Sequence, residues 1–131
     1  MKRLLFFLAL LSTSPALAQQ TLSGAEFEAL TTGRTFSYTV DGEGYGAEQY
    51  LSRRGVLWSF EPGQCLHGTW FAQNDEICFV YDDDPAPVCW RFYLDDNGLS
   101  AELAEEPVGS RRYMAHEQSE NLFCPGPKTG V

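Results

Sequence analysis

Apolar and polar residues alternate with a period of two through most of the chain, from about residue 34 to residue 104. The first run places Phe36, Tyr38 and Val40 on one face, and similar runs recur between turn signals such as Pro62-Gly63 and Asn97-Gly98. Closely spaced short strands without intervening helices are typical of an antiparallel meander. An open sheet of this many strands would expose two edges. The sequence therefore predicts an all-β fold of seven or eight strands, a small barrel or curled sheet, with a sandwich as the second choice.

One short helix is predicted ahead of the meander. Ser23-Gly24-Ala25-Glu26 fits a capping box at a helix N-terminus. Apolar residues follow at helical spacing, and Gly33 is a suitable C-terminal stop. We therefore expect a helix over about residues 24–31 and a last strand near residues 112–115. After His116 the sequence predicts an irregular C-terminal tail.

The N-terminus has the layout of a secretory signal peptide. Lys2-Arg3 is followed by an apolar run at residues 4–11 and by Ala16-Leu17-Ala18, which places small residues at the −3 and −1 positions of a cleavage site. The alternative is a buried N-terminal helix or strand. No apolar run approaches the length of about 20 residues that a membrane helix needs. The sequence predicts a signal peptide at 1–18, a single mature domain at 19–131, a periplasmic or secreted location, and no membrane insertion.

Four cysteines remain after the predicted cleavage site. An even number in a small exported chain is typical of disulfides. The rival interpretation is a zinc site, but zinc sites favour closely spaced pairs and the chain has no Cys-x-x-Cys. We therefore predict two disulfides among Cys65, Cys78, Cys89 and Cys124.

One hairpin can be aligned residue by residue. If Cys78 lies opposite Cys89 in the fifth and sixth strands, then Glu76 lies opposite Arg91 on the same outward face. Opposite residues of a ladder are close enough for a disulfide. The inward face of this pairing carries Ile77, Phe79, Val88 and Trp90. The alignment predicts a Cys78–Cys89 disulfide and a Glu76–Arg91 ion pair, and elimination leaves a Cys65–Cys124 disulfide.

Large aromatic side chains fall on the predicted inward faces, and small residues lie among them. Gly46 and Gly68 are expected to leave room for neighbouring rings. Eight-stranded barrels are only just wide enough to leave a small cavity. The sequence therefore predicts an interior filled by side chains, among them Phe36, Trp58, Phe60, Trp70, Phe79, Trp90 and Phe92.

The chain is acidic, and its acids cluster in turns. The formal net charge is −9, and it becomes −11 when Lys2 and Arg3 leave with the signal peptide. Such a charge repels nucleic acid and anionic lipid and attracts basic partners, although it also serves solubility alone. Neither acidic turn has the Gly and Glu spacing of an EF-hand, and aspartate is common in turns as a cap. The candidate binding loops are Asp82, Asp83 and Asp84, and Asp95 and Asp96.

No catalytic constellation stands out. His67 lies two residues from Cys65, which suggests a thiol–imidazole pair, but an oxidised cysteine beside a surface histidine is the simpler interpretation. His116 lies near the tail. Phosphate-binding, dinucleotide-binding and hydrolase motifs are absent from the sequence. We predict no catalytic, cofactor-binding or metal-binding residue.

Two resemblances bear on the fold. Gly68-Thr69-Trp70 resembles the G-x-W strand element of calycin barrels such as lipocalins and avidins, where this element lies on the first strand. The Cys-x-x-Gly-x-Trp…Cys…Cys pattern, from Cys65 to Cys89, is similar to that of a group of small exported bacterial β proteins of unknown function. This second resemblance implies a secreted β domain and assigns no activity.

The function we expect is an exported, non-enzymatic binding module without a cofactor. Its acidic loops would engage a basic protein or peptide at one barrel end. The alternatives are a hydrolase with a hidden site, a calycin-like carrier of a small apolar ligand, and a structural envelope protein. A filled interior would weaken the carrier, and a concave site with convergent acids or His67 would favour the hydrolase.

Overall fold

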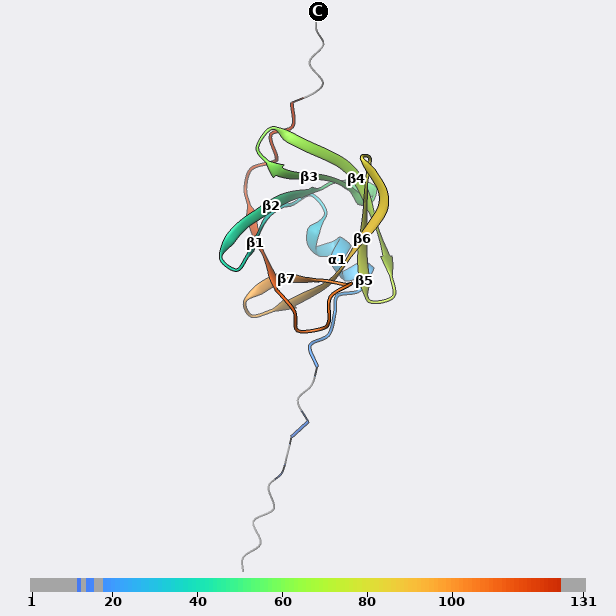
Figure 1. Ribbon diagram of the computed structural model, residues 1–131, viewed down its shortest axis with the longest axis vertical. Coiled ribbons are helices and arrows are strands. Elements are labelled where there is room, and N and C mark those ends of the chain that lie inside the picture. The colour runs from blue at the N-terminus through green and yellow to red at the C-terminus, as the bar shows by residue number, and fades with distance from the viewer. Residues whose placement is uncertain (1–11, 13, 16–17, 126–131) are drawn as a thin grey trace, which may run out of the picture.

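The strands close into a barrel, as the alternation predicts (Figure 1). The computed structural model describes residues 12, 14–15 and 18–125. Each strand pairs antiparallel with the next one along the chain, and the last pairs with the first, with Thr35 opposite Gln118. Among these residues no helix is long and apolar enough to cross a membrane. The predicted signal peptide at 1–18 lies almost entirely outside the described residues, so its cleavage stays a prediction.

The elements follow the predicted order. A short 3₁₀ turn at Ser52–Arg54 joins the second and third strands. The last strand extends beyond the expected end at Ala115, because it pairs with the whole first strand to close the barrel. The bounds are α1 (Gly24–Thr31), β1 (Thr35–Val40), β2 (Glu43–Tyr50), β3 (Gly55–Glu61), β4 (Gln64–Gln73), β5 (Glu76–Tyr81), β6 (Asp84–Asp95), β7 (Gly98–Leu103) and β8 (Tyr113–Gln118).

The helix α1 closes one end of the barrel, and Figure 1 shows it inside the ring of strands. The predicted capping box is present: the Ser23 hydroxyl accepts from the Glu26 amide, and the Glu26 carboxylate accepts from the Ser23 amide. Phe27 projects from α1 into the core and is fully buried. Its ring lies within 6.4 Å, centroid to centroid, of four others: Tyr50, Trp70, Phe79 and Phe92.

The barrel is regular at the end where α1 lies and bulged at the other end. The hairpins β2–β3, β4–β5 and β6–β7 turn at the α1 end and pair without a shift in register. The hairpins β1–β2, β3–β4 and β5–β6 turn at the opposite end, and each has a register shift near its turn. In β1–β2, Tyr38 pairs with Gly46 but Thr39 pairs with Gly44, so Tyr45 is the extra residue of a bulge. Bulges bend and twist strands, and they are frequent at barrel rims.

The β5–β6 hairpin has the predicted register and disulfide, but not the predicted ion pair. Cys78 lies opposite Cys89, and the two are bonded. Arg91 pairs instead with Glu102, with 3.5 Å between Nη2 and Oε2. The prediction of a Glu76–Arg91 pair was wrong because it considered only the two strands of one hairpin.

The partner of Arg91 comes from the next hairpin, because Glu102 on β7 lies directly opposite Arg91 on β6. The loop between β7 and β8 then folds over the outer face of the barrel. Arg91 donates to the carbonyl oxygens of Leu103, Ala104 and Glu106, at the end of β7 and the start of that loop. Glu102 is only 1% exposed, and its other carboxylate oxygen lies 3.1 Å from Nη2 of Arg112. The two arginines thus neutralise one buried carboxylate, as a buried charge requires.

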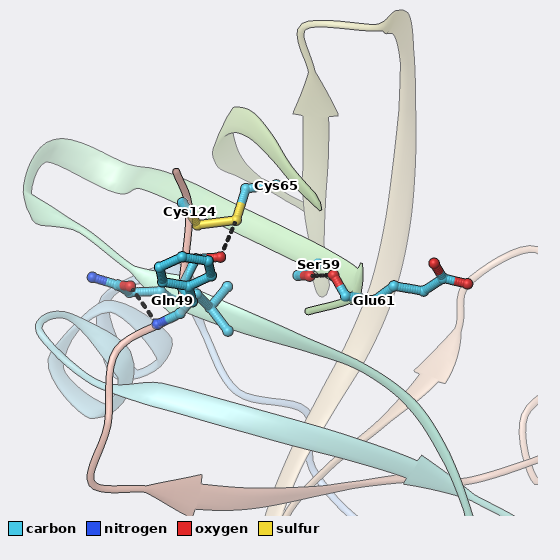
Figure 2. The surroundings of a disulfide bond; sticks show 7 residues. Gln49, Ser59, Glu61, Cys65 and Cys124 are labelled. Carbon is cyan, nitrogen blue, oxygen red and sulfur yellow. Dashed lines mark hydrogen bonds between the residues drawn. A yellow bond between two sulfur atoms is a disulfide. The ribbon is translucent and has the colours of Figure 1, made fainter. Parts of the chain in front are cut away.

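The second disulfide joins Cys65 to Cys124, as elimination predicted, and holds the C-terminal tail against the barrel wall (Figure 2). The tail runs outside the strands, where the Leu122 amide donates to the side-chain oxygen of Gln49 on β2. A disulfide sulfur carries no hydrogen, so the 3.6 Å approach of the Cys65 sulfur to the Phe123 carbonyl oxygen is a packing contact. The tail has no strand of its own through Pro125; the disulfide therefore fixes its position.

Candidate ligand-binding cavity

The barrel interior is not filled. It holds a cavity of about 200 Å³, and the prediction of a filled core was wrong on this point. Phe27 and its neighbours occupy the helix end, whereas at the opposite end Phe60 is 61% exposed and Val88 43% exposed. The cavity therefore opens at the bulged end. Its lining residues are Tyr38, Tyr45, Glu48, Tyr50, Trp58, Phe60, Leu66, Phe79, Tyr81, Asp83, Val88, Trp90, Phe92, Ala101 and Tyr113.

Small residues on the wall allow the space to exist. A Cβ atom at Gly46 would lie 2.3 Å from Cζ2 of Trp58, and one at Gly68 would lie 2.8 Å from Cδ1 of Tyr81. The rings of Trp58 and Tyr81 therefore lie against backbone instead of projecting further into the barrel. These are the two glycines expected to make room for rings. Ala101 supplies a third small position on β7.

A belt of contacting aromatic rings lines part of the cavity wall. The ring of Tyr45, the bulge residue, lies 5.5 Å from that of Trp58 and 4.9 Å from that of Tyr113. Tyr113 in turn lies 4.9 Å from Trp90. Each of these pairs is tilted or edge-to-face, which is the arrangement that aromatic quadrupoles favour. We call these four side chains (Tyr45, Trp58, Trp90 and Tyr113) the aromatic belt.

One carboxyl group lies inside the barrel. Glu48 on β2 is 1% exposed and lines the cavity. The Tyr81 hydroxyl lies 3.0 and 3.2 Å from its two oxygens and donates to it. Burial raises the pKa of Glu48 well above its ordinary value, and the hydrogen bond from Tyr81 only partly offsets this. The carboxyl therefore gains a proton more readily than a carboxyl on the surface.

A tyrosine pair lies beside this carboxyl. The hydroxyl oxygens of Tyr38 and Tyr50 are 2.7 Å apart, and both residues are buried. Burial is the largest cause that raises the pKa of each phenol, and the nearby Glu48 charge raises it further. Both therefore stay neutral at physiological pH. Together with Tyr81 they give the cavity three hydroxyl groups around one carboxyl.

No family model, no curated protein and no solved structure matches this chain.

The two predicted acidic loops lie at opposite ends of the barrel. Asp82, Asp83 and Asp84 are at the bulged end, where Asp83 borders the mouth of the cavity. Asp95 and Asp96 are at the helix end, where the Gln19 side chain donates to Asp95. Consecutive hairpin turns of a meander must lie at opposite ends, so the strand order already contained this information.

Part of each acidic loop caps its own turn. The Asp84 carboxylate accepts from the Ala86 amide at 2.9 Å, and the Asp95 carboxylate accepts from the Asn97 amide at 2.8 Å. This is the local capping expected of aspartate in turns. Only Asp83 of the five candidate residues is brought to the cavity.

Neither histidine lines the cavity. His67 is exposed on β4, and Cys65 beside it is oxidised, so no thiol–imidazole pair exists. The His116 Nε2 atom lies 3.0 Å from the Thr39 hydroxyl. Among the described residues, Glu76, Cys78 and Cys89 have potential metal ligands within 4.8 Å of one another, but both sulfurs are in the disulfide and offer no thiolate.

Sequence reasoning missed Glu48 and the tyrosines around it. A usable signal was present, because Glu48 and Tyr50 are two residues apart and therefore share a face of β2. The large aromatic ring of Tyr50 favours burial and so indicates that this face points inward. The same face carries Glu48, so its carboxyl group would have been predicted inside the barrel. The inward direction of Tyr45 had no such signal, because it depends on the bulge.

Proposed function

We propose that this chain is an exported, non-enzymatic binding protein that holds a small, largely apolar ligand in the barrel cavity. The observation that carries the proposal is a closed barrel with one end sealed by α1 and an aromatic cavity open at the other. Small-molecule sites are concave and mostly apolar, with a few polar groups that orient the ligand. Here the polar groups are Glu48 and the hydroxyls of Tyr38, Tyr50 and Tyr81. The resemblance to calycin barrels agrees with this assignment.

If the protein is instead a hydrolase, its candidate catalytic acids are the two carboxyl groups that line the cavity, those of Glu48 and Asp83. The carrier is favoured because the carboxyl of Glu48 already accepts a hydrogen bond from the Tyr81 hydroxyl and because neither histidine reaches the cavity. Mass spectrometry of a bound ligand distinguishes the two functions. A carrier returns the ligand chemically unchanged, whereas a hydrolase returns its products.

Tryptophan fluorescence tests where the ligand binds. Trp58 and Trp90 line the cavity, whereas Trp70 packs against Phe27 and the Arg54 guanidinium outside it. Variants that retain a single tryptophan should therefore respond differently to a panel of single-ring aromatic compounds. We expect a saturable change in the variants that retain Trp58 or Trp90 and none in the variant that retains only Trp70. A response confined to Trp70, or no response to any compound, contradicts the proposal.

Filling the cavity provides a second test. Ala101→Leu adds a larger side chain to the lining, so it should abolish the fluorescence response while the protein remains folded. Ala29→Leu makes the same change at an exposed position of α1 and serves as the matched control. Binding that survives Ala101→Leu and is lost in the control would place the ligand elsewhere.

Export is the other half of the proposal. The N-terminal sequence and the two disulfides support it. The intact mass of the exported protein should correspond to a chain that begins at Gln19. A mass that retains residues 1–18 would contradict the predicted cleavage.

Engagement of a basic protein or peptide by the acidic loops is a weaker proposal, because the two loops are at opposite ends. A partner would contact Asp82, Asp83 and Asp84 or Asp95 and Asp96, but not both groups in one small footprint. Replacing the first group by Asn should weaken capture of basic envelope proteins at low salt. If capture depends neither on these substitutions nor on the salt concentration, the acidic loops do not bind a basic partner and serve solubility only.

A further inference from the structure

The ionisable groups that line the cavity have one sign of charge. Glu48 lies inside and Asp83 lies at the mouth, and no lysine, arginine or histidine is among the lining residues. A low-dielectric cleft with charge of a single sign concentrates ligands of the opposite sign. The formal net charge of the whole chain is −9, which adds to the same field. The Arg111 guanidinium lies 5.9 Å from the centroid of Tyr113 but pairs with Asp41. An anionic ligand would therefore meet repulsion from Asp83 at entry and from Glu48 inside whenever Glu48 is ionised.

The aromatic belt offers a second attraction for a cation. A cation within about 6 Å of a ring centroid is attracted by the ring face, and tryptophan and tyrosine are among the best partners. The belt contains two tryptophans and two tyrosines that contact one another at centroid distances of 4.9–5.5 Å, so a cation on the cavity side of one ring also lies near a second ring. Glu48 lies further along β2 than Tyr45, and its cross-strand partner is Trp58 of the belt. A cation held by the belt therefore lies near a carboxyl.

We propose that the ligand of this cavity is a small organic cation, with its charge held between the aromatic belt and the Glu48 carboxylate. This inference rests on the proposed function, since it names the ligand class of the same cavity. The roles divide by position: Asp83 attracts the cation at the mouth, the belt replaces part of its hydration, and Glu48 neutralises it. Tyr81 orients Glu48 through its hydrogen bond.

The cavity volume limits the size of the cation. An apolar cavity of about 150 Å³ is sufficient for benzene. This cavity, at about 200 Å³, therefore suits one ring with a short substituent, and its open mouth allows the ligand to protrude. Phenyltrimethylammonium and tert-butylbenzene are matched probes of this size. They have the same shape, differ in charge, and neither of them titrates.

Binding of a cation should be coupled to release of a proton. The titratable groups that face Glu48 are Tyr38 from β1, Tyr50 from β2 and Tyr81 from β5, and burial keeps all three neutral. Glu48 is therefore the group that changes protonation, and a cation must displace its proton at any pH below its raised pKa. Affinity for phenyltrimethylammonium should fall as the pH is lowered through that pKa. Affinity for tert-butylbenzene should not.

The test compares both probes on three forms of the oxidised mature protein by tryptophan fluorescence and calorimetry. We expect the wild-type protein to bind phenyltrimethylammonium at least tenfold more tightly than tert-butylbenzene. Glu48→Gln should remove this preference while tert-butylbenzene still binds, because glutamine keeps the size of the side chain and an oxygen that accepts from Tyr81. Asp96→Asn changes the net charge equally at the far end of the barrel, so it should keep the preference.

Two outcomes overturn the inference in distinguishable ways. If tert-butylbenzene binds as tightly as its charged counterpart, or if Glu48→Gln leaves the preference intact, the cavity is a ligand site without selectivity for cations. If neither probe binds and the single-tryptophan variants respond to no compound, the proposed function fails as well.

Discussion

Glu48 illustrates how a single side chain can be costly to the fold and useful to the site. A carboxyl group that leaves water loses hydration, and a neutral barrel wall does not replace it. Tyr81 supplies the one hydrogen-bond donor that the structure gives Glu48. Protonation lowers the remaining cost, which is why burial raises the pKa of this residue. In the empty cavity we therefore expect a carboxyl that destabilises the fold whenever it ionises.

This cost should make the free energy of unfolding depend on pH. Because the folded-state pKa of Glu48 is above its ordinary value of 4.5, folding binds a proton. The resulting stabilisation is present below about pH 4.5 and is lost as the pH rises through the raised pKa. Glu48→Gln should gain stability relative to wild type over that window, as measured by urea unfolding at pH 4.5 and pH 8. A difference that does not change with pH would contradict the ionisation of Glu48 inside the barrel.

Gly46 is a residue whose lack of a side chain shapes the cavity. Gly46→Ala would place a Cβ atom 2.3 Å from Cζ2 of Trp58 and force the indole away from the wall. We expect a loss of about 1–3 kcal/mol in unfolding free energy, the usual cost of overpacking, together with an altered tryptophan emission spectrum. Gly44→Ala is the matched control on the same strand, since a Cβ atom there meets nothing within 4 Å. Equal effects of the two substitutions would show that the glycines matter only for backbone conformation.

At the scale of elements, α1 and the bulged hairpins divide the barrel into a closed end and an open end. The helix is short, and it is held at its start by the Ser23 capping box and at its centre by Phe27. A helix of this length is marginal in isolation, so its stability comes mainly from packing onto the barrel. The register shifts lie at the other end, where the β1–β2 bulge turns Tyr45 toward the cavity.

The capping box should contribute measurably to the closed end. Ser23→Ala removes the acceptor for the Glu26 amide and should cost about 1 kcal/mol in unfolding free energy. Ser23→Asp supplies an equivalent acceptor and should restore most of the loss. Hydrogen exchange of the first amides of α1 would locate the effect. Failure of aspartate to restore stability would mean that Ser23 acts through something other than capping.

At the scale of the whole molecule, the two disulfides differ in the sequence separation that each one bridges. Cys78 and Cys89 are 11 residues apart in one hairpin, whereas Cys65 and Cys124 are 59 residues apart and bring the tail back to β4. The Cys78–Cys89 disulfide links two strands that are already paired by backbone hydrogen bonds. The second determines where the tail lies, because the tail has no strand of its own and contributes one amide to Gln49.

Removing each disulfide should therefore have a different effect. In the chain-entropy view, the cost of losing a disulfide rises with the length of the loop it closes. Replacing both Cys78 and Cys89 by Ser should cost about 2–4 kcal/mol, and replacing both Cys65 and Cys124 should cost about 4 kcal/mol. Urea unfolding measures both, and proteolysis should cleave the tail only in the second variant. A larger loss from the hairpin disulfide would indicate strain or residual structure in the unfolded chain.

Local patterns were sufficient for much of this fold. The alternation predicted the strands, the capping box predicted α1, and the pairing of Cys78 with Cys89 followed from the faces of one hairpin. These features are readable because each depends on residues close together in the chain, where the period of the strand or helix determines which side chains share a face.

The remaining features depend on contacts that reach beyond a single hairpin. The partner of Arg91 is Glu102 and not Glu76, because β6 pairs with β7 as well as with β5 and this places Glu102 opposite Arg91. The cavity exists because barrel closure, three register shifts and two glycines together leave space that no single strand encodes. The alternation could place Glu48 on the inward face. Whether that face encloses a packed core or a cavity depends on the closed arrangement of all eight strands. The volume left inside is the small difference between the width of the barrel and the summed volumes of its inward side chains.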